Sequence, residues 1–202
     1  HHFVLAYDFS LNPDLRLKIE PYVQLLYDVP VIPDSSYSTI NIKAEWFYTD
    51  KLNNSGTGTN FGIDLTLERF LKDGFYYLFT ASLFESKYVG GDDIERNTRY
   101  NTNVVINLLF GKEWALGASK NKILGINGRL NILGGQRTAP LNRDLSNQQG
   151  EVIYDYSKQY EDRNPNIYHL NMSVNYRINK MKLAHIFSLQ VLNILGMEEH
   201  YG

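Results

Sequence analysis

Apolar and polar side chains alternate with a period of two through most of this chain of 202 residues. In a β-strand, every second side chain points to the same face, so a strand with this pattern has one apolar and one polar face. In the clearest segment, 168–179, one face carries Tyr168, Leu170, Met172, Val174, Tyr176 and Ile178. Alternation also occurs at 3–11, 15–25, 60–68, 75–83, 103–111, 124–132 and 187–191. It predicts an all-β chain of about eight antiparallel strands. Pro21 lacks an N–H group and predicts a bulge or a weakened pairing in the second of these strands.

The connections between these segments alternate between short and long. Short connections fall near Asn12, Asp73, Ser119 and Asn179, and long ones cover about 28–59, 89–102 and 134–165. Outer-membrane barrels have short periplasmic turns and long extracellular loops, whereas a soluble β-sandwich has no reason to sort its connections in this way. The pattern therefore predicts an antiparallel transmembrane β-barrel segment in a bacterial outer membrane, with residues 1–202 forming one domain.

Composition excludes several other classes of protein. The chain has no cysteine, so a disulfide framework or a cysteine-ligated metal is not expected. The formal net charge of -2 argues against a nucleic-acid surface. No apolar run reaches the length of a spanning helix, which leaves spanning strands open. The 15 Tyr and 10 Phe residues favour strands, and those near the ends of segments fit the aromatic belts of a membrane barrel as well as simple β-propensity.

Two segments allow more than one interpretation. Residues 39–47 also alternate, and a spanning strand there would invert the topology after it, so we expect a hairpin arm within the first long loop. The chain begins at His1 without a signal region, so an exported protein would here be mature, trimmed or internal. His1 and His2 fit either a tag remnant or a strand start.

Five runs follow one another along the chain: GTGTNFGIDLTLE at 56–68, LFESKY at 83–88, IERNT at 94–98, GGQRTAP at 134–140 and VLNIL at 191–195. In this order they resemble the carboxyl-terminal half of the barrel in TonB-dependent outer-membrane receptors of the Bacteroidota type, where the pattern of the first run is common. The resemblance extends from about residue 2 to residue 195.

The resemblance implies a 22-stranded barrel closed by an amino-terminal plug. Such a receptor takes up a scarce nutrient (siderophore, cobalamin, glycan or peptide) with energy from the TonB complex. It implies outer-membrane lipid, the plug, the TonB complex and the nutrient as partners, with no cofactor and no catalytic residue. This chain departs from the family in having no plug, no TonB-contacting region, too few strands to close that barrel and no terminal aromatic strand. We therefore expect an incomplete barrel domain.

Two sets of residues are candidates for function. Charge is expensive on a lipid face and tolerated in a hydrated or plugged lumen, which predicts a lumen-facing set: Arg16, Lys18, Glu20, Glu68, Arg129 and Arg177. The resemblance implies that these residues contact the plug, with substrate guidance as the rival role. Binding residues lie more often on loops than on the scaffold, so the outer loops supply a substrate-binding set: Tyr88, Arg96, Arg99, Gln136 and Arg137.

Three other constellations are weaker. His169 lies near Asp155 and Asp162 in sequence and could act as a general base for hydrolysis, although a solvated histidine is the simpler interpretation. No two of His169, His185 and His200 have the spacing of metal ligands. Asp92, Asp93 and Glu95 could bind calcium but are more typical of a solvated acidic loop. The Gly-Thr-Gly run at 56–58 is not followed by the Lys-Ser/Thr pair and the helix of a phosphate-binding loop. It is better explained as a flexible bend before a strand. No metal site is predicted.

Two other functions stay open. The chain could be a self-contained outer-membrane barrel of about eight strands, acting as an adhesin, a structural protein or, less readily, a hydrolase. It could also be a soluble ligand-binding barrel, although the loop lengths and the lumen-type charges disfavour this. Pairing of the first strand with the last would favour the self-contained barrel.

Overall fold

The computed structural model describes residues 1–42 and 50–198, and its long elements are all strands. The main strands are β1 (His2–Val4), β2 (Tyr7–Asn12), β3 (Leu15–Val31), β4 (Asn53–Lys72), β5 (Phe75–Val89), β7 (Val104–Leu116), β8 (Lys122–Leu133), β11 (Ile167–Asn179) and β12 (Ala184–Val191). The short elements are β6 (Glu95–Asn97), β9 (Arg137–Thr138), β10 (Asp162–Arg163), the helix α1 (Arg143–Gln149) and the 3-10 turns η1 (Thr39–Asn41) and η2 (Tyr156–Lys158). None of the helices in the described ranges is long and apolar enough to cross a membrane.

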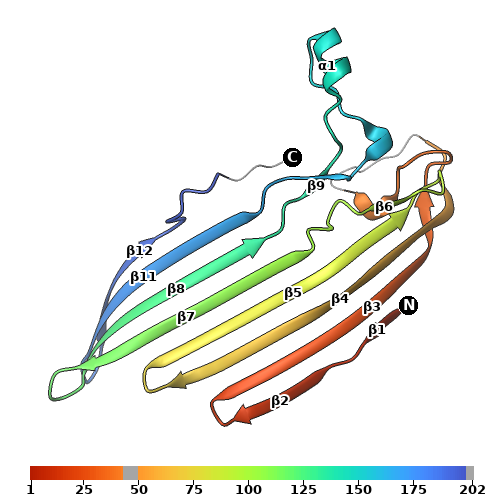
Figure 1. Ribbon diagram of the computed structural model, residues 1–202. Helices are drawn as coiled ribbons and strands as arrows, with labels where there is room; N and C mark the ends of the chain where they lie inside the picture. Colours follow the sequence, from red (N-terminus) through yellow and green to blue (C-terminus); the bar gives the residue numbers. More distant parts are fainter. Residues whose placement is uncertain (43–49, 199–202) are drawn as a thin grey trace.

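The strands form one antiparallel sheet in which neighbours in the chain are neighbours in space. The order is β1-β3-β4-β5-β7-β8-β11-β12, and β2 continues the edge begun by β1 because both pair with β3. In the part of the chain that the structure describes, β12 is not paired with β1 or β2, so the sheet is open (Figure 1). The expected all-β antiparallel architecture is confirmed.

The strand register gives this sheet two chemically distinct faces. Residues directly opposite each other on neighbouring strands share a face, and one such row runs Leu17, Leu67, Phe79, Leu108, Leu130 and Leu170. The adjacent row on the other face runs Lys18, Thr66, Thr80, Asn107, Asn131 and His169. We call these the apolar face and the polar face.

Among the described residues, no second layer covers either face of the sheet (Figure 1). Ile63, Val174 and Leu189 on the apolar face are 41%, 43% and 68% exposed. A soluble domain instead packs the apolar face of a sheet against another element. Among the described residues, the sheet therefore lacks a conventional core between two packed layers.

The few buried side chains lie almost all at the loop end of the sheet. Val31 and Tyr88 are 0% and 1% exposed, and Thr98 and Asn101 are 1% and 0% exposed. The long loops gather at this end, while the short turns lie at the opposite end (Figure 1). The compact part of the protein is thus the loop cluster.

The weakened pairing expected at Pro21 is found on one side of β3: the edge breaks there between β1 and β2, whereas Pro21 stays in register with Ile63 of β4 on the other side. Two local expectations need correction. Gly56 and Gly58 lie inside β4 and are not a bend; a side chain at Gly56 would collide with Val31, so close packing explains this glycine. Residues 39–41 form a 3-10 turn and not a hairpin arm, while residues 43–47 of that expected arm lie outside the described residues.

Candidate ligand-binding loops

Three loops meet at the loop end of the sheet: the first loop (32–52, described at 32–42 and 50–52), the second loop (90–103) and the third loop (134–166). The first and second loops pack backbone against backbone. The Asp34 amide donates to the Gly91 carbonyl at 3.1 Å, and the Asp92 amide donates to the Ser35 carbonyl at 3.2 Å. A side chain at Gly91 would collide with the Ile32 carbonyl. This glycine therefore permits the close approach of the two loops.

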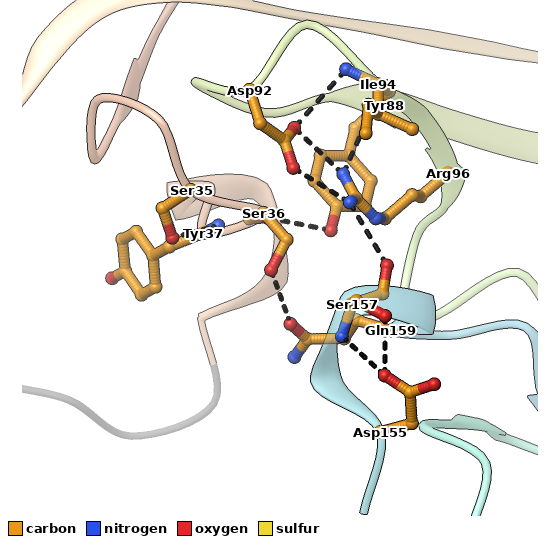
Figure 2. A network of polar contacts seen from close by, with 10 residues as sticks. All are labelled: Ser35, Ser36, Tyr37, Tyr88, Asp92, Ile94, Arg96, Asp155, Ser157 and Gln159. Carbon is orange, nitrogen blue, oxygen red and sulfur yellow. Dashed lines mark hydrogen bonds and ion pairs between the residues drawn. The ribbon is translucent and has the colours of Figure 1, made fainter.

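Tyr88, at the end of β5, lies at the centre of the loop cluster (Figure 2). Its hydroxyl donates to the Ser36 carbonyl at 2.9 Å, and its ring meets Tyr160 edge-on at 6.2 Å between centroids. Ser36 in turn donates through its hydroxyl to Gln159 Oε1 at 3.0 Å. Tyr88 was predicted to contact a substrate, but its side chain is enclosed and supports the first and third loops.

Arg96 connects the second loop to the third (Figure 2). Its guanidinium donates to both carboxylate oxygens of Asp92 at 2.9 and 2.8 Å, and to the Ser157 carbonyl at 3.2 Å. The Arg96 side chain is only 8% exposed. The hydrogen bonds from Arg96 lower the pKa of Asp92 and the same contact raises the pKa of Arg96, so both groups stay charged. Arg96 is thus engaged in joining loops.

A buried amide network holds the second loop on the sheet. Asn101 donates to Glu85 Oε2 at 3.0 Å and to Asn97 Oδ1 at 2.8 Å, and it accepts from the Ser86 amide at 3.1 Å. Asn103 donates to Glu85 Oε1 at 2.7 Å. The Glu85 carboxylate is therefore held by amide donors and not by a cation.

Arg137, at the start of the third loop, joins this network through neutral acceptors. It donates to the Asn101 carbonyl at 3.0 Å, to Asn103 Oδ1 at 2.8 Å and to the Glu161 carbonyl at 3.3 Å. Desolvation lowers the pKa of Arg137, and the nearby charge of Arg163 lowers it further. The negative charge of Glu85 opposes this shift of the pKa, and the guanidinium remains charged.

An open groove of about 560 Å³ runs between the third loop and the second. Aromatic, charged and amide side chains line it: Arg99, Arg137, Thr138, Ala139, Leu141, Tyr154, Tyr156, Gln159, Tyr160, Asp162 and Asn164. We call this the tyrosine groove. Its size and mixture of rings with a few charged groups are typical of small-molecule sites.

A smaller recess of about 170 Å³ adjoins the tyrosine groove and shares three residues with it, Arg99, Gln159 and Tyr160. The other residues that line it are Ser36, Tyr37, Ser38, Asn41 and Ile42. We call this the amide recess. Tyr160, in its wall, has a φ of 64°, an uncommon conformation for a residue with a bulky side chain. Such strained residues cluster at binding sites.

The predicted substrate-binding residues separate into three groups. Arg99 and Arg137 line the tyrosine groove, whereas Tyr88 and Arg96 lie behind it as supports. Gln136 is exposed, does not line the groove, and receives the Asn164 amide on its carbonyl at 2.9 Å. Their contact with a ligand stays a prediction.

Sequence reasoning missed the tyrosines at 154, 156 and 160 and the amide of Asn41. The three tyrosines lie within seven residues of a long loop, and this density of aromatic residues in a predicted loop was an available signal. Asn41 gave no signal, because only the folded loops bring it beside Arg99.

The predicted lumen-facing charges all lie on the polar face. Arg16 is 2.5 Å from Asp8 and 3.8 Å from Glu68, and Lys18 is 2.7 Å from Glu20. Arg129 and Arg177, two of this set, form no salt bridge among the described residues. Arg177 also has a buried Nε without a hydrogen-bond partner. Whether this face lines a lumen stays a prediction.

The weaker candidates have structural contacts. Asp92 pairs with Arg96, and Glu95 pairs with Lys87 at 3.1 Å, so two of the carboxylates considered for calcium already face cations. The described residues contain no group of three or more His, Cys, Asp or Glu side chains that could hold a metal ion.

The histidine considered as a base for hydrolysis lies on β11, and the two carboxylates near it in sequence lie in the third loop. His169 faces Asn131 across the strands, whereas Asp155 accepts from the Ser157 amide at 3.1 Å and Asp162 lines the tyrosine groove. His185 lies on β12 opposite Ile178, and His200 lies outside the described residues.

Comparison of the chain with known protein families, curated proteins and solved structures finds no match.

Proposed function

We propose that this chain forms part of the wall and outer loops of a TonB-dependent receptor in a bacterial outer membrane. In this proposal, the receptor takes up a scarce nutrient that binds among the long loops. Ligand release and energy coupling depend on a plug and a TonB contact outside this sequence. The observation that most supports a location in a membrane is the uncovered sheet with one continuous apolar face.

Several features of the sheet support an origin in a membrane barrel. Its apolar face would be solvated by lipid tails, whereas its polar face would line an aqueous or plugged interior. Trp114, Tyr176 and Phe187 fall in the row near the short turns, on the apolar face. Aromatic side chains at that level are typical of the interfacial belt of such a barrel.

Side-chain hydrogen bonds across the strands support a fixed polar face. Tyr76 of β5 donates to Asn127 Oδ1 of β8 at 2.7 Å, and Asn127 donates to Ser173 Oγ of β11 at 3.3 Å. A second chain links Thr80, Asn107 and Asn131. Networks of this kind, in which the polar groups bond to one another, make a polar interior rigid.

The open edges favour a larger barrel over a self-contained one. β1 and β2 at one edge and β12 at the other each have an unpaired side among the described residues. Unpaired edges are costly in lipid, so additional strands would have to complete the ring. In the alternative, a closed eight-stranded barrel, cysteines along β2 would cross-link to cysteines along β12; systematic failure of these cross-links supports the larger barrel.

Topology can be tested by cysteine labelling, because these 202 residues contain no cysteine and any cysteine elsewhere in the full-length protein can first be replaced by serine. Leu145→Cys lies in α1 of the third loop, and Met181→Cys lies in the short turn after β11. In cells that express the full-length protein, a membrane-impermeant maleimide should label Leu145→Cys directly and Met181→Cys only after permeabilisation. Equal labelling of both positions in intact cells would contradict the proposed orientation.

Energy coupling needs a separate test, because it rests on the sequence resemblance alone. Formaldehyde cross-linking in energised cells should give a TonB adduct of the full-length protein. If no adduct forms while the cysteine labelling agrees with the proposed orientation, the assignment as a TonB-dependent receptor is wrong and the proposal of an outer-membrane barrel stays.

A further inference from the structure

The amide recess contains two hydrogen-bond donors that the described residues leave without acceptors. Asn41 is 9% exposed, and its side-chain Nδ2 is buried without a hydrogen-bond partner. The opposite end of the same amide is occupied, because Asn41 Oδ1 accepts from the Arg99 backbone amide at 2.8 Å. This contact fixes the orientation of the side chain and leaves Nδ2 as the free group.

Arg99 supplies the second donor. Its side chain lines both the amide recess and the tyrosine groove, and the described residues provide no hydrogen bond or ion pair to its guanidinium. Arg96, three residues earlier, differs because Asp92 neutralises it. A half-buried guanidinium without a carboxylate partner among the described residues offers a planar set of donors for an anion.

The lining of the amide recess is complementary to an acceptor with negative charge. None of the described residues that line it is acidic: around Asn41 and Arg99 lie serine hydroxyls, tyrosine rings, Ile42 and the Gln159 amide. A buried donor without an acceptor is destabilising. A ligand that places an acceptor beside this donor removes the destabilisation, which makes its binding more favourable. The neighbouring tyrosine groove adds Arg137, whose own partners are neutral carbonyl oxygens.

From this geometry we propose that the amide recess binds the carboxylate of an organic ligand whose ring-containing body lies on Tyr154 and Tyr156 in the tyrosine groove. The inference rests on the proposed function only in treating these loops as the ligand-binding end of a receptor. A volume of about 170 Å³ accommodates a carboxylate with a few attached atoms, and about 560 Å³ accommodates the body. Asp162 is the acidic side chain on the groove lining, and it lies outside the recess.

The test uses probe compounds on the purified full-length protein in detergent at low salt, with binding followed by ligand-observed NMR. The probes are 4-hydroxyphenylacetate, the corresponding amide, phenyl phosphate and phenyl sulfate. We expect the carboxylate to bind at least about tenfold more tightly than its amide, since a hydrogen bond to a charged group is worth at least that factor. Equal binding of acid and amide would overturn the proposal, and tighter binding of the phosphate or the sulfate would overturn the choice of carboxylate.

Two variants locate the effect. Asn41→Asp keeps the acceptor for the Arg99 amide while replacing the free donor with a negative charge, and Arg99→Gln removes the guanidinium. Each should abolish the preference for the acid over the amide. Lys158→Gln is the matched control, because Lys158 is an exposed cation of the same loops that lines neither cavity. A preference unchanged by Asn41→Asp and Arg99→Gln, or lost in Lys158→Gln, would contradict the assignment.

These outcomes are independent of the membrane topology. The comparison of acid with amide on the unaltered protein needs no variant to fold and no TonB complex. Failure here with correct cysteine labelling would remove the carboxylate site and keep the receptor proposal.

Discussion

At the scale of single residues, the paired charges of the loops divide into buried and exposed pairs. Arg96 and Asp92 are 8% and 20% exposed, whereas Lys87 and Glu95 are 43% and 60% exposed. Solvent screens the exposed pair, so only the Arg96 pair is expected to contribute strongly to loop stability.

Arg96→Ala should therefore loosen the second and third loops together. The change leaves Asp92 without its bidentate partner and releases the Ser157 carbonyl, and we expect a loss of about 2 kcal/mol in local opening free energy. Hydrogen exchange of residues 92–97 and 155–161 measures it. Lys87→Ala, the control, should change the opening free energy by less than about 1 kcal/mol. Similar effects of the two variants would refute the structural role of Arg96.

The same pair predicts a pH dependence. Arg96 lowers the pKa of Asp92 below its usual value, so the stabilisation is complete above an unfolded-state pKa of about 3.9 and is lost as the pH falls through the lower pKa of the folded state. Pepsin cleavage within the second and third loops should accelerate on acidification below pH ~4. Asp92→Asn should cleave readily throughout and lose this added pH dependence; an identical pH profile for both proteins would contradict the prediction.

At the scale of elements, glycines make room for side chains that reach across a strand. Tyr76 of β5 crosses β7 at Gly111 to reach Asn127 of β8, and a side chain at Gly111 would lie 2.5 Å from both the Tyr76 ring and Asn127 Oδ1. The sequence contains the glycine but not the reason for it, because the reason is a contact between strands fifty residues apart.

Gly111→Val should therefore destabilise the sheet by more than the loss of one hydrogen bond. Overpacking at such a site costs about 1–3 kcal/mol, and the displaced Tyr76 hydroxyl adds to it. Tyr76→Phe, which removes only the hydroxyl, should cost about 1 kcal/mol. Urea unfolding in lipid vesicles gives both values, and a smaller effect for Gly111→Val than for Tyr76→Phe would show that the crossing does not matter.

Arginine substitutions at two neighbouring positions on β11 should have different effects on stability, because the two side chains lie on opposite faces of the sheet. Val174 lies on the apolar face opposite Ile126 and Leu189, whereas Ser173 lies on the polar face opposite Asn127 and Gln190. An arginine on a lipid-facing strand costs about 2–4 kcal/mol near the bilayer midplane. Val174→Arg should therefore reduce stability in vesicles by that much more than Ser173→Arg, and equal losses would argue that neither face contacts lipid.

At the scale of the whole molecule, the sequence predicted the sheet better than the loops. Alternation placed the strands and put Arg16, Lys18, Glu20, Glu68, Arg129 and Arg177 on one face, because a period of two leaves only the register to be determined. The loops lack such a period: Arg96 and Arg99 look alike in sequence, yet one is buried against Asp92 and the other lines a cavity. Partners separated by fifty or more residues, such as Tyr88 with Ser36, decide those roles.

In the proposed wall of a membrane barrel, the apolar face of the sheet contacts lipid and the polar face contacts water. Single spin-labelled cysteines at successive positions 168–178 of β11, in the full-length protein reconstituted in vesicles, test it by accessibility to oxygen, which partitions into lipid, and to a water-soluble nickel chelate. We predict a period of two with a fixed phase: oxygen accessibility highest at even positions such as Leu170 and Val174, and nickel accessibility highest at odd positions such as Asn171 and Asn175. The opposite phase, or nickel accessibility at every position, would contradict a membrane-embedded wall.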